Sequence, residues 1–279
     1  MKVLIIDRDP MFSNLLAGKI RAAGHEVIEK TVKNDGLEEL GTKQIDAVYF
    51  DPSPLSDPKA IIFHIRKAVH TYPYLVMMTA EGDQRAAIEA GCNDVLAKPL
   101  DPQALTASLA NMERMTNLVN RIGDENFDFP SRGGVISKSA FNQLFRSAID
   151  RVSRYNELSH VLFISIQNYE DIKLDDGKYA ADYAASKLAQ NLVRLRRQSD
   201  ILAQTAENEY AILLQRPQTP TESMDAAKRF ASSLQNQDDI TSNGVTNLVI
   251  DVSLVHLPTG ALNFNHTNRV SGQATRSSG

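Results

Sequence analysis

The stretch Ala206-Glu207-Asn208-Glu209-Tyr210, followed by Ala211-Ile212-Leu213-Leu214, decides how the second half of this chain is interpreted. The apolar run after residue 210 has the length and composition of a buried strand. The polar residues before it fit a tight turn that joins this strand to a preceding one. The stretch therefore predicts a β-hairpin, and on this pattern alone its polar residues are an ordinary solvated turn.

Further elements are predicted on both sides of this hairpin, so that residues 135–259 form one α+β domain. The remaining residues, 260–279, are rich in Asn, Ser, Thr and Gly and hold few large apolar side chains, which predicts a disordered tail. The expected helices cover 138–154, 180–197 and 223–234, and the expected strands cover 161–166 and 247–257.

Residues 1–121 alternate short apolar strands with amphipathic helices, which is the pattern of a doubly wound, five-stranded parallel sheet. The last helix of this domain begins at Asp101-Pro102, a capping acid followed by a proline. Residues 122–134 turn acidic and then rich in Pro, Ser and Gly, which predicts a linker. The expected strands of the first domain cover 3–7, 26–30, 45–51, 74–79 and 94–97.

The composition of the chain excludes several classes of protein. Its 279 residues have room for two domains, and the net charge of −4 comes without a basic helix that would read nucleic acid. The six histidines lack metal-ligand spacing, and Cys92 is the only cysteine, which fits a reducing compartment. No apolar run approaches the roughly 20 residues of a membrane span. We expect a cytoplasmic protein that binds neither nucleic acid nor membrane.

Four polar residues stand at the carboxyl ends of the predicted parallel strands, where open α/β sheets gather their chemistry. These residues are Asp7, Asp51, Thr79 and Lys98, and together they resemble the phosphoacceptor site of response-regulator receiver domains. The resemblance implies Asp51 as the phosphoacceptor, with Thr79 and Lys98 holding phosphoryl oxygens. It also implies Mg²⁺ held by Asp7, Asp51 and the carbonyl of Ser53.

The receiver resemblance departs from the family pattern at Arg8, where most receivers carry a second acid that binds the metal. A guanidinium repels Mg²⁺, and Asp9 stands one residue further on, so we expect weak Mg²⁺ binding and no obligatory cofactor. Two interpretations stay open. Asp51 is phosphorylated as a regulatory input, or it pairs with Arg8 or Lys98 in a receiver fold kept for dimerisation.

The hairpin resembles the catalytic hairpin of GGDEF domains, the diguanylate cyclases, in altered form. Its two glycines, which let a phosphate approach the backbone, are Ala206 and Glu207, and its metal-binding acid is Asn208. Two-metal phosphoryl transfer needs such carboxylates, so the resemblance implies a domain without cyclase activity. In the same register, the first metal-binding acid falls on Ser165, the two guanine contacts on Lys173 and Asp182, and the last two hairpin positions on Glu209 and Tyr210.

One family feature stands in register nine residues before Ala206. The sequence Arg197-Gln198-Ser199-Asp200 resembles the inhibitory RxxD site that binds cyclic di-GMP, and Arg151 and Arg229 fall where a further arginine often joins it. Arginine forks onto phosphate, and aspartate accepts from guanine N–H groups. The alternative is that arginines near the end of a helix favour its dipole without any ligand. A second RxxD copy, Arg121-Ile122-Gly123-Asp124, shows how short the motif is.

These resemblances together imply a bacterial two-component response regulator, with a receiver joined to a degenerate GGDEF domain that is a cyclic di-GMP receptor. The implied partners are cyclic di-GMP, a sensor histidine kinase, a downstream signalling protein and a second copy of the chain in a homodimer. The rival interpretation is a ligand-independent scaffold built from the same two domains.

Overall fold

The computed structural model describes residues 1–55, 57–68, 72–124, 126–235 and 246–270. Its internal contacts divide the chain into two compact units. Among the described residues, the first unit contains Met1–Asn120, Ile149–Glu157 and Pro258–Ala261, and the second contains Arg121–Ala148, Leu158–Leu257 and residues 262–270. Each unit has its own five-stranded sheet, and each is described separately below.

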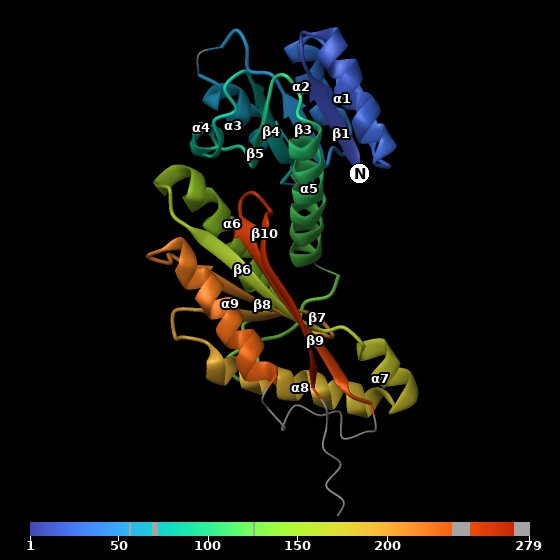
Figure 1. Cartoon of the computed structure of the whole chain (residues 1–279), viewed down its shortest axis with the longest axis vertical. Helices are drawn as coiled ribbons and strands as arrows, with labels where there is room; N and C mark the ends of the chain where they lie inside the picture. The colour runs from blue at the N-terminus through green and yellow to red at the C-terminus, as the bar shows by residue number, and fades with distance from the viewer. Residues whose placement is uncertain (56, 69–71, 125, 236–245, 271–279) are drawn as a thin grey trace, which may run out of the picture. The chain divides into compact units, whose positions relative to one another are not determined.

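The first unit holds a parallel sheet of order β2-β1-β3-β4-β5, so the predicted doubly wound fold is confirmed (Figure 1). The strand order reverses between β1 and β3, and ligands of such sheets bind at this point. The elements are β1 (Lys2–Ile6), α1 (Pro10–Ala22), β2 (Glu26–Lys30), α2 (Lys33–Thr42), β3 (Ala47–Phe50), α3 (Lys59–Ala68), β4 (Tyr74–Thr79), α4 (Gln84–Ala90), β5 (Asp94–Ala97) and α5 (Pro102–Gly123).

Two local features of the first unit position the ends of β1 and β3. Asp9 caps α1, because its carboxylate accepts from the backbone N–H groups of Met11 and Phe12. In α2, a Cβ on Gly36 would lie 2.6 Å from Cδ1 of Ile6, so only glycine lets this helix pack so closely against β1. The start of α2 is thereby held beside the carboxyl ends of the central strands.

The second unit holds an antiparallel sheet of order β10-β9-β6-β8-β7, and its predicted α+β class is confirmed. The predicted hairpin is the β7–β8 pair, whose turn lies at residues 207 and 208. The remaining elements of the chain are α6 (Lys138–Tyr155), which belongs to the first unit from Ile149 onward, and β6 (Ser159–Ile166), α7 (Tyr169–Asp175), α8 (Lys178–Leu195), β7 (Ile201–Ala206), β8 (Glu209–Gln215), α9 (Pro220–Gln235), β9 (Leu248–Leu257) and β10 (Leu262–Val270).

The core of the second unit explains which face of the sheet its helices cover. Leu162, Ile164 and Ile166 alternate along β6, and all three belong to one buried cluster with apolar residues of α8 and α9. This period of two is the pattern of a strand with one face on the core. The opposite face of β6 carries Phe163 and Ser165, and Ser165 is only half-buried.

The predicted disordered tail is wrong for residues 262–270, which form β10 and pair with β9 in antiparallel register. The strand has a polar composition because it lies at the sheet edge and buries few side chains. The buried side chains of β10 include Asn268 and Val270. The Asn268 amide donates to the carbonyl of Ala231 at 2.7 Å. Residues 271–279 of the predicted tail lie outside the described residues.

Two further segments differ from the pattern read in the sequence. Helix α8 ends at Leu195, so Arg197 lies in the turn that follows instead of on the helix. Part of the segment predicted as a linker belongs to the second unit. There Arg132 pairs with Val135 in a short bridge, and Asp128 accepts hydrogen bonds from the backbone and hydroxyl of Ser139.

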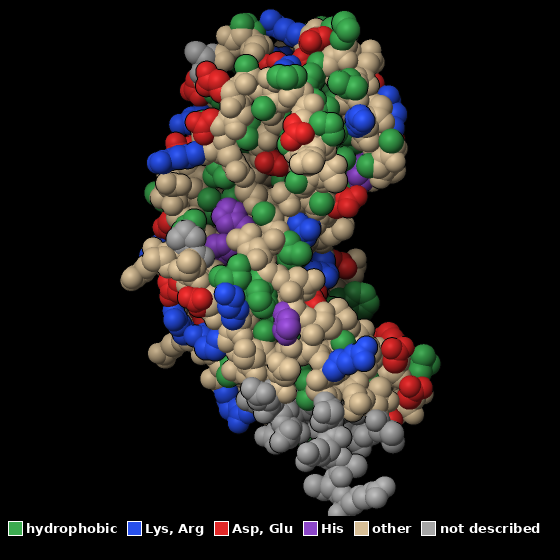
Figure 2. All heavy atoms as spheres, viewed as in Figure 1, with side chains coloured by type: hydrophobic (Ala, Val, Ile, Leu, Met, Phe, Trp, Pro, Cys, Tyr) green, Lys and Arg blue, Asp and Glu red, His purple; other side chains and the backbone are tan. Residues whose placement is uncertain are grey.

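The surface carries both signs of charge, as the 30 basic and 34 acidic residues lead one to expect. Figure 2 shows Lys and Arg side chains lying among Asp and Glu side chains on the visible face. Within the described residues, no helix has the length and apolar character that crossing a membrane requires.

Candidate functional site

The structure brings together the two acids and the lysine predicted at the strand ends of the first unit. Asp7 and Asp51 follow β1 and β3, the two strands between which the sheet order reverses. The Lys98 ammonium bridges them, 2.7 Å from Oδ2 of Asp7 and 2.5 Å from Oδ2 of Asp51. Asp51 is thus paired with Lys98, which is one of the two partners foreseen for it.

Hydrogen bonding decides the protonation state of Asp51. Burial opposes its charge, but hydrogen bonds from Lys98 and Ser53 outweigh this and lower the pKa of the carboxyl group. Burial likewise opposes the charge of Lys98, and its hydrogen bonds to Asp51 and Asp7 raise its pKa above the usual value. Both groups are therefore charged at neutral pH.

The other predicted receiver residues take different roles. The Thr79 hydroxyl accepts from the backbone N–H of Gly82 at 3.0 Å, and the Thr79 carbonyl accepts from the N–H of Lys98 at 2.8 Å. Thr79 and Lys98 therefore lie next to each other, and their role at phosphoryl oxygens stays a prediction. Asp9 caps α1 and Arg8 is exposed, so neither replaces the missing acid at this site.

The oxygen atoms that Mg²⁺ would need are engaged by ammonium groups of the chain. Lys33, the first residue of α2, donates to the carbonyl of Pro52 at 2.5 Å and to the carbonyl of Ser53 at 2.7 Å. Asp7 and Asp51 are occupied by Lys98. Within the described ranges, no cluster of three His, Cys, Asp or Glu side chains suits a metal. The residues present do not fit the divalent cation that the receiver resemblance implies.

Sequence reasoning missed Lys33, because nothing in its neighbourhood marks it as part of a site. It lies 20 residues from Ser53 in the chain, and only the fold joins them.

In the second unit, the hairpin turn is held to β6 by two hydrogen bonds of Asn208. The backbone N–H of Ile166 donates to the Asn208 carbonyl at 2.9 Å. In return the Asn208 side-chain amide donates to the Ile166 carbonyl at 2.9 Å. A carboxylate at position 208 could not donate this second bond. The asparagine therefore serves the packing of the turn.

Two positions that differ from the family pattern, Lys173 on α7 and Glu207 in the hairpin turn, pair with each other. The Lys173 ammonium lies 3.8 Å from Oε2 of Glu207 and 3.4 Å from Oε1 of Glu170. Asp182, the retained guanine contact of the resemblance, accepts a hydrogen bond from the Tyr169 hydroxyl at 2.7 Å. The two charges that distinguish this site from the family pattern, those of Lys173 and Glu207, thus lie close to each other.

Glu209 is the buried acid of the hairpin, and its partners also come from the chain. Arg121 lies 2.9 Å from its Oε2, and the Thr205 hydroxyl donates to its Oε1 at 2.6 Å. Burial raises the pKa of Glu209, while Arg121 and Thr205 oppose that rise. The neighbouring position on β6 is Ser165, which provides no charge beside Glu209.

The two RxxD copies differ in the contacts of their arginine and aspartate. Arg121 is engaged by Glu209, whereas Asp124 accepts from the backbone of Asn126 at 3.0 Å. In the first copy, the Asp200 carboxylate accepts from the N–H of Arg197 at 2.9 Å, which closes a compact turn. Only this copy joins its arginine and aspartate.

Arg197, Asp200 and Arg229 line one cavity of about 400 Å³ in the second unit, so the structure brings these three predicted residues together. Arg216 lines it as well, and so does Ser223, whose buried hydroxyl has no hydrogen-bond partner among the described residues. Its volume falls in the range of pockets that hold small ligands.

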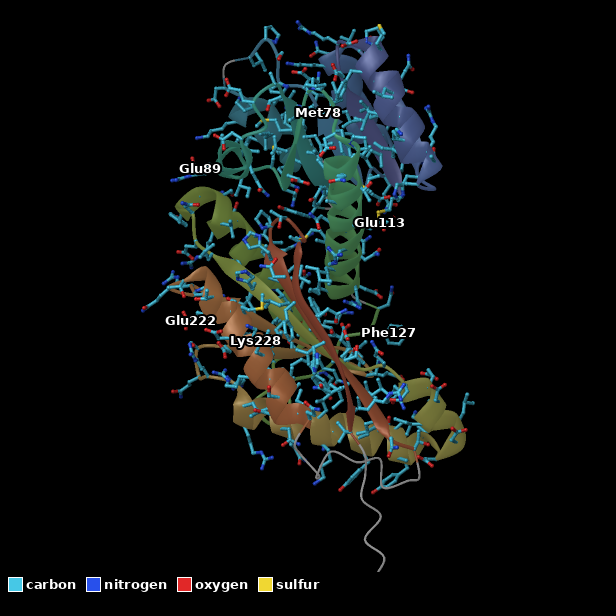
Figure 3. All side chains as sticks on the ribbon, viewed as in Figure 1. Met78, Glu89, Glu113, Phe127, Glu222 and Lys228 are labelled. Carbon is cyan, nitrogen blue, oxygen red and sulfur yellow. The ribbon has the colours of Figure 1, made fainter. Side chains whose placement is uncertain are left out.

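The Arg197 guanidinium is ion-paired with Glu222 on α9, which Figure 3 labels. Glu222 also accepts from the backbone N–H of Gln218 at 2.8 Å. Thr219 and Glu222 have the spacing of a capping box, which predicts the start of a helix. This local pattern does not predict the contact of Glu222 with Arg197. Glu222 therefore occupies the arginine in this structure.

Arg151, the other predicted partner arginine, belongs to the first unit. There it forms a two-pronged ion pair with Glu157, with nitrogen–oxygen distances of 2.8 and 2.7 Å.

Comparison with known proteins assigns the second unit. Residues 132–274, just over half of the chain, match the family model described as "Diguanylate cyclase, GGDEF domain". The chain belongs to the GGDEF family. Its GGDEF domain carries the β7–β8 hairpin, the cavity at Arg197 and the sheet edge β10. No curated protein sequence matches the chain.

Solved structures resemble each unit in turn. A Chloroflexus aurantiacus protein described as a response regulator is 31% identical, over 40% of this chain and 95% of its own, with a TM-score of 0.35. A two-component response regulator from Clostridium difficile is 24% identical, over 42% and 98%, with a TM-score of 0.38. The GGDEF domain of YfiN from Pseudomonas aeruginosa is 21% identical, over 43% and 74%, with a TM-score of 0.38. The receiver fold is assigned to the first unit from the order of its own strands, β2-β1-β3-β4-β5.

Proposed function

We propose that this protein is a receptor for cyclic di-GMP, with the ligand bound at the cavity of Arg197, Asp200 and Arg229. The observation that carries the proposal is that these three residues line one cavity, although Arg229 lies on α9 and the other two lie in the turn between α8 and β7. The family of the second unit and the receiver fold of the first support this proposal, because both are consistent with two-component and cyclic di-GMP signalling.

The chemistry of the cavity suits a dianionic dinucleotide. Three arginines, at positions 197, 216 and 229, line it and supply planar donors for phosphate oxygens or guanine edges. Asp200 is an acceptor for guanine N–H groups, and the unpartnered hydroxyl of Ser223 is a further donor or acceptor. Bound ligand would satisfy that buried hydroxyl.

We further propose that the GGDEF domain does not make cyclic di-GMP. Ser165 and Asn208 remove two carboxylates from the positions that hold metal in the family pattern. The third acid, Glu209, is engaged by Arg121 and Thr205. Glu207 places a negative charge where a nucleotide phosphate would approach, and Lys173 cannot accept a hydrogen bond from guanine.

A second function, the ligand-independent scaffold, is favoured by the ion pair between Arg197 and Glu222. In that case Glu222 serves as the permanent partner of Arg197, and the two domains serve only to dock other proteins. In the receptor proposal, by contrast, a ligand phosphate displaces Glu222 from Arg197. A sensor histidine kinase, a homodimer and a downstream protein stay predictions under both functions.

The test is a calorimetric titration of cyclic di-GMP into nucleotide-free protein and into the Arg197→Ala variant. Micromolar or tighter binding that is lost in Arg197→Ala supports the receptor. The matched control is Arg146→Ala, which removes an exposed arginine of α6 and leaves the cavity intact. No heat in the wild type would leave the scaffold in place, and product formed from GTP with Mg²⁺ or Mn²⁺ would overturn the loss of cyclase activity.

A further inference from the structure

Lys33 has a role that the proposed function does not use. It is the first residue of α2, where a positive charge opposes the helix dipole and gains nothing from the helix itself. Its ammonium nevertheless reaches the loop after β3 and contacts two successive carbonyls, at 2.5 Å for Pro52 and 2.7 Å for Ser53. Two converging carbonyl oxygens are a typical surrounding for a cation.

The packing of α2 explains why the lysine reaches this loop. Gly36 lies against Ile6, the last residue of β1, at a distance that no side chain would allow. The first turn of α2 is therefore fixed next to the loop after β3 that contains Pro52 and Ser53, called the acceptor loop below, and the long Lys33 side chain spans the remaining gap.

The formal charges around Asp51 balance without an added ion. Asp7, Asp9 and Asp51 contribute three negative charges, and Arg8, Lys33 and Lys98 contribute three positive ones. Lys98 occupies the Oδ2 atoms of Asp7 and Asp51, and Lys33 occupies the carbonyls of the following loop. A divalent cation would have to displace an ammonium and would add two uncompensated charges.

We infer that the Lys33 ammonium is a built-in cation of the receiver, which takes the place of the divalent metal at the Ser53 carbonyl. The acceptor loop is then held by the chain itself, and its conformation does not depend on Mg²⁺. This inference is independent of ligand binding in the second unit, because no residue of the Arg197 cavity takes part in it.

The experiment is a calorimetric titration of MgCl₂ into the full chain, for the wild type and for Lys33→Met. Removing the ammonium frees the two carbonyls and takes away one positive charge. We therefore expect saturable millimolar Mg²⁺ binding in Lys33→Met and no Mg²⁺ binding in the wild type. Lys59→Met removes an exposed lysine at the start of α3 and is expected to behave as the wild type. Backbone amide shifts of Asp51 and Ser53 on adding Mg²⁺, followed by NMR, locate the bound ion.

Either of two results would overturn the inference. One is saturable Mg²⁺ binding by the wild type that moves the Asp51 and Ser53 amides. The other is the lack of such binding in both Lys33→Met and Lys33→Gln when their amide spectra show a folded receiver. The glutamine variant keeps a neutral donor to the loop, so it guards against loss of the fold in the methionine variant.

Discussion

The acceptor site of the receiver and the hairpin of the GGDEF domain differ in which residues they keep. In the receiver fold, Asp7, Asp51, Thr79 and Lys98 match the family pattern described above, whereas Ala206, Glu207 and Asn208 of the hairpin depart from it. In both sites, side chains of the protein nevertheless contact the oxygen atoms. In the receiver, Lys98 and Lys33 occupy the oxygen atoms, and in the hairpin, Lys173, Asn208 and Arg121 do so.

The comparison teaches that a motif residue has to be judged by its contacts as well as by its identity. A carboxylate acts on a phosphate or a metal only if its charge is available at the moment of binding. Lys98, which is itself part of the receiver pattern, already contacts one carboxylate oxygen of Asp51. At Glu209 the partner is Arg121, from a segment that precedes the family match.

The largest expected effect comes from removing the partner of the buried hairpin acid. Arg121→Ala leaves Glu209, which is 8% exposed, without its counter-charge, and we expect the second unit to lose about 3 kcal/mol of unfolding free energy. Urea unfolding followed by circular dichroism measures the loss. The double variant Arg121→Ala with Glu209→Gln should recover most of it. A loss no greater than that of Arg146→Ala would show that Glu209 does not depend on this pair.

A pH scan is expected to separate the two units. Burial lowers the pKa of His160 to about 4, and it lowers the pKa of its cross-strand neighbour His256 as well. The unfolded chain therefore binds protons first as pH falls below 6.5, and His160 alone should cost the second unit about 2 kcal/mol between pH 7 and pH 5. The contribution of Asp51, whose folded pKa is lowered, is lost only below about pH 4.

Hydrogen exchange resolved by unit, recorded across this pH range, measures that separation. His160→Leu should flatten the response of the second unit, and the control His266→Asn, at an exposed position of β10, should leave it unchanged. Equal loss of protection in both units between pH 7 and pH 5 would contradict the assignment to the histidine pair.

A smaller effect is expected at the cavity of the GGDEF domain. Glu222→Gln removes the charge that holds Arg197, so cyclic di-GMP no longer competes with a carboxylate, and we expect its affinity to rise about tenfold. Calorimetry against the wild type measures the change, with Glu170→Gln as the control for loss of one exposed acid elsewhere in the unit. Unchanged or weaker binding would mean that Glu222 does not compete with the ligand.

The smallest effect is expected at the exposed hairpin pair. Glu207 is 61% exposed in its side chain, so its contact with Lys173 is screened by solvent. Glu207→Gln should therefore change the unfolding free energy by less than about 0.5 kcal/mol in the same urea experiment. A loss as large as that of Arg121→Ala would make this pair a structural element of the domain.

Much of the fold could be predicted, because periodicity and turn residues are local signals. The parallel strands of the first unit and the hairpin at residues 206–214 followed from apolar runs and their spacing. Strand β10 could not be recognised, since an edge strand with mostly exposed side chains has the composition of a polar tail. The end of α8 was predicted two residues too late, because Arg194, Arg196 and Arg197 are compatible with a helix. In the structure the Asp200 carboxylate accepts from the N–H of Arg197 and closes a turn there instead.

The sequence by itself determined which chemical groups stand at the ends of the strands, because a strand's end is a local property and parallel strands end at one edge. It also placed Arg197 and Asp200 in one short motif. Only the tertiary structure decided what those groups contact. Lys33 meets Ser53 across 20 residues, and Arg197 meets Glu222 across 25. Such partners are set by how helices pack on the sheets, and no local pattern of hydrophobicity or charge encodes that geometry.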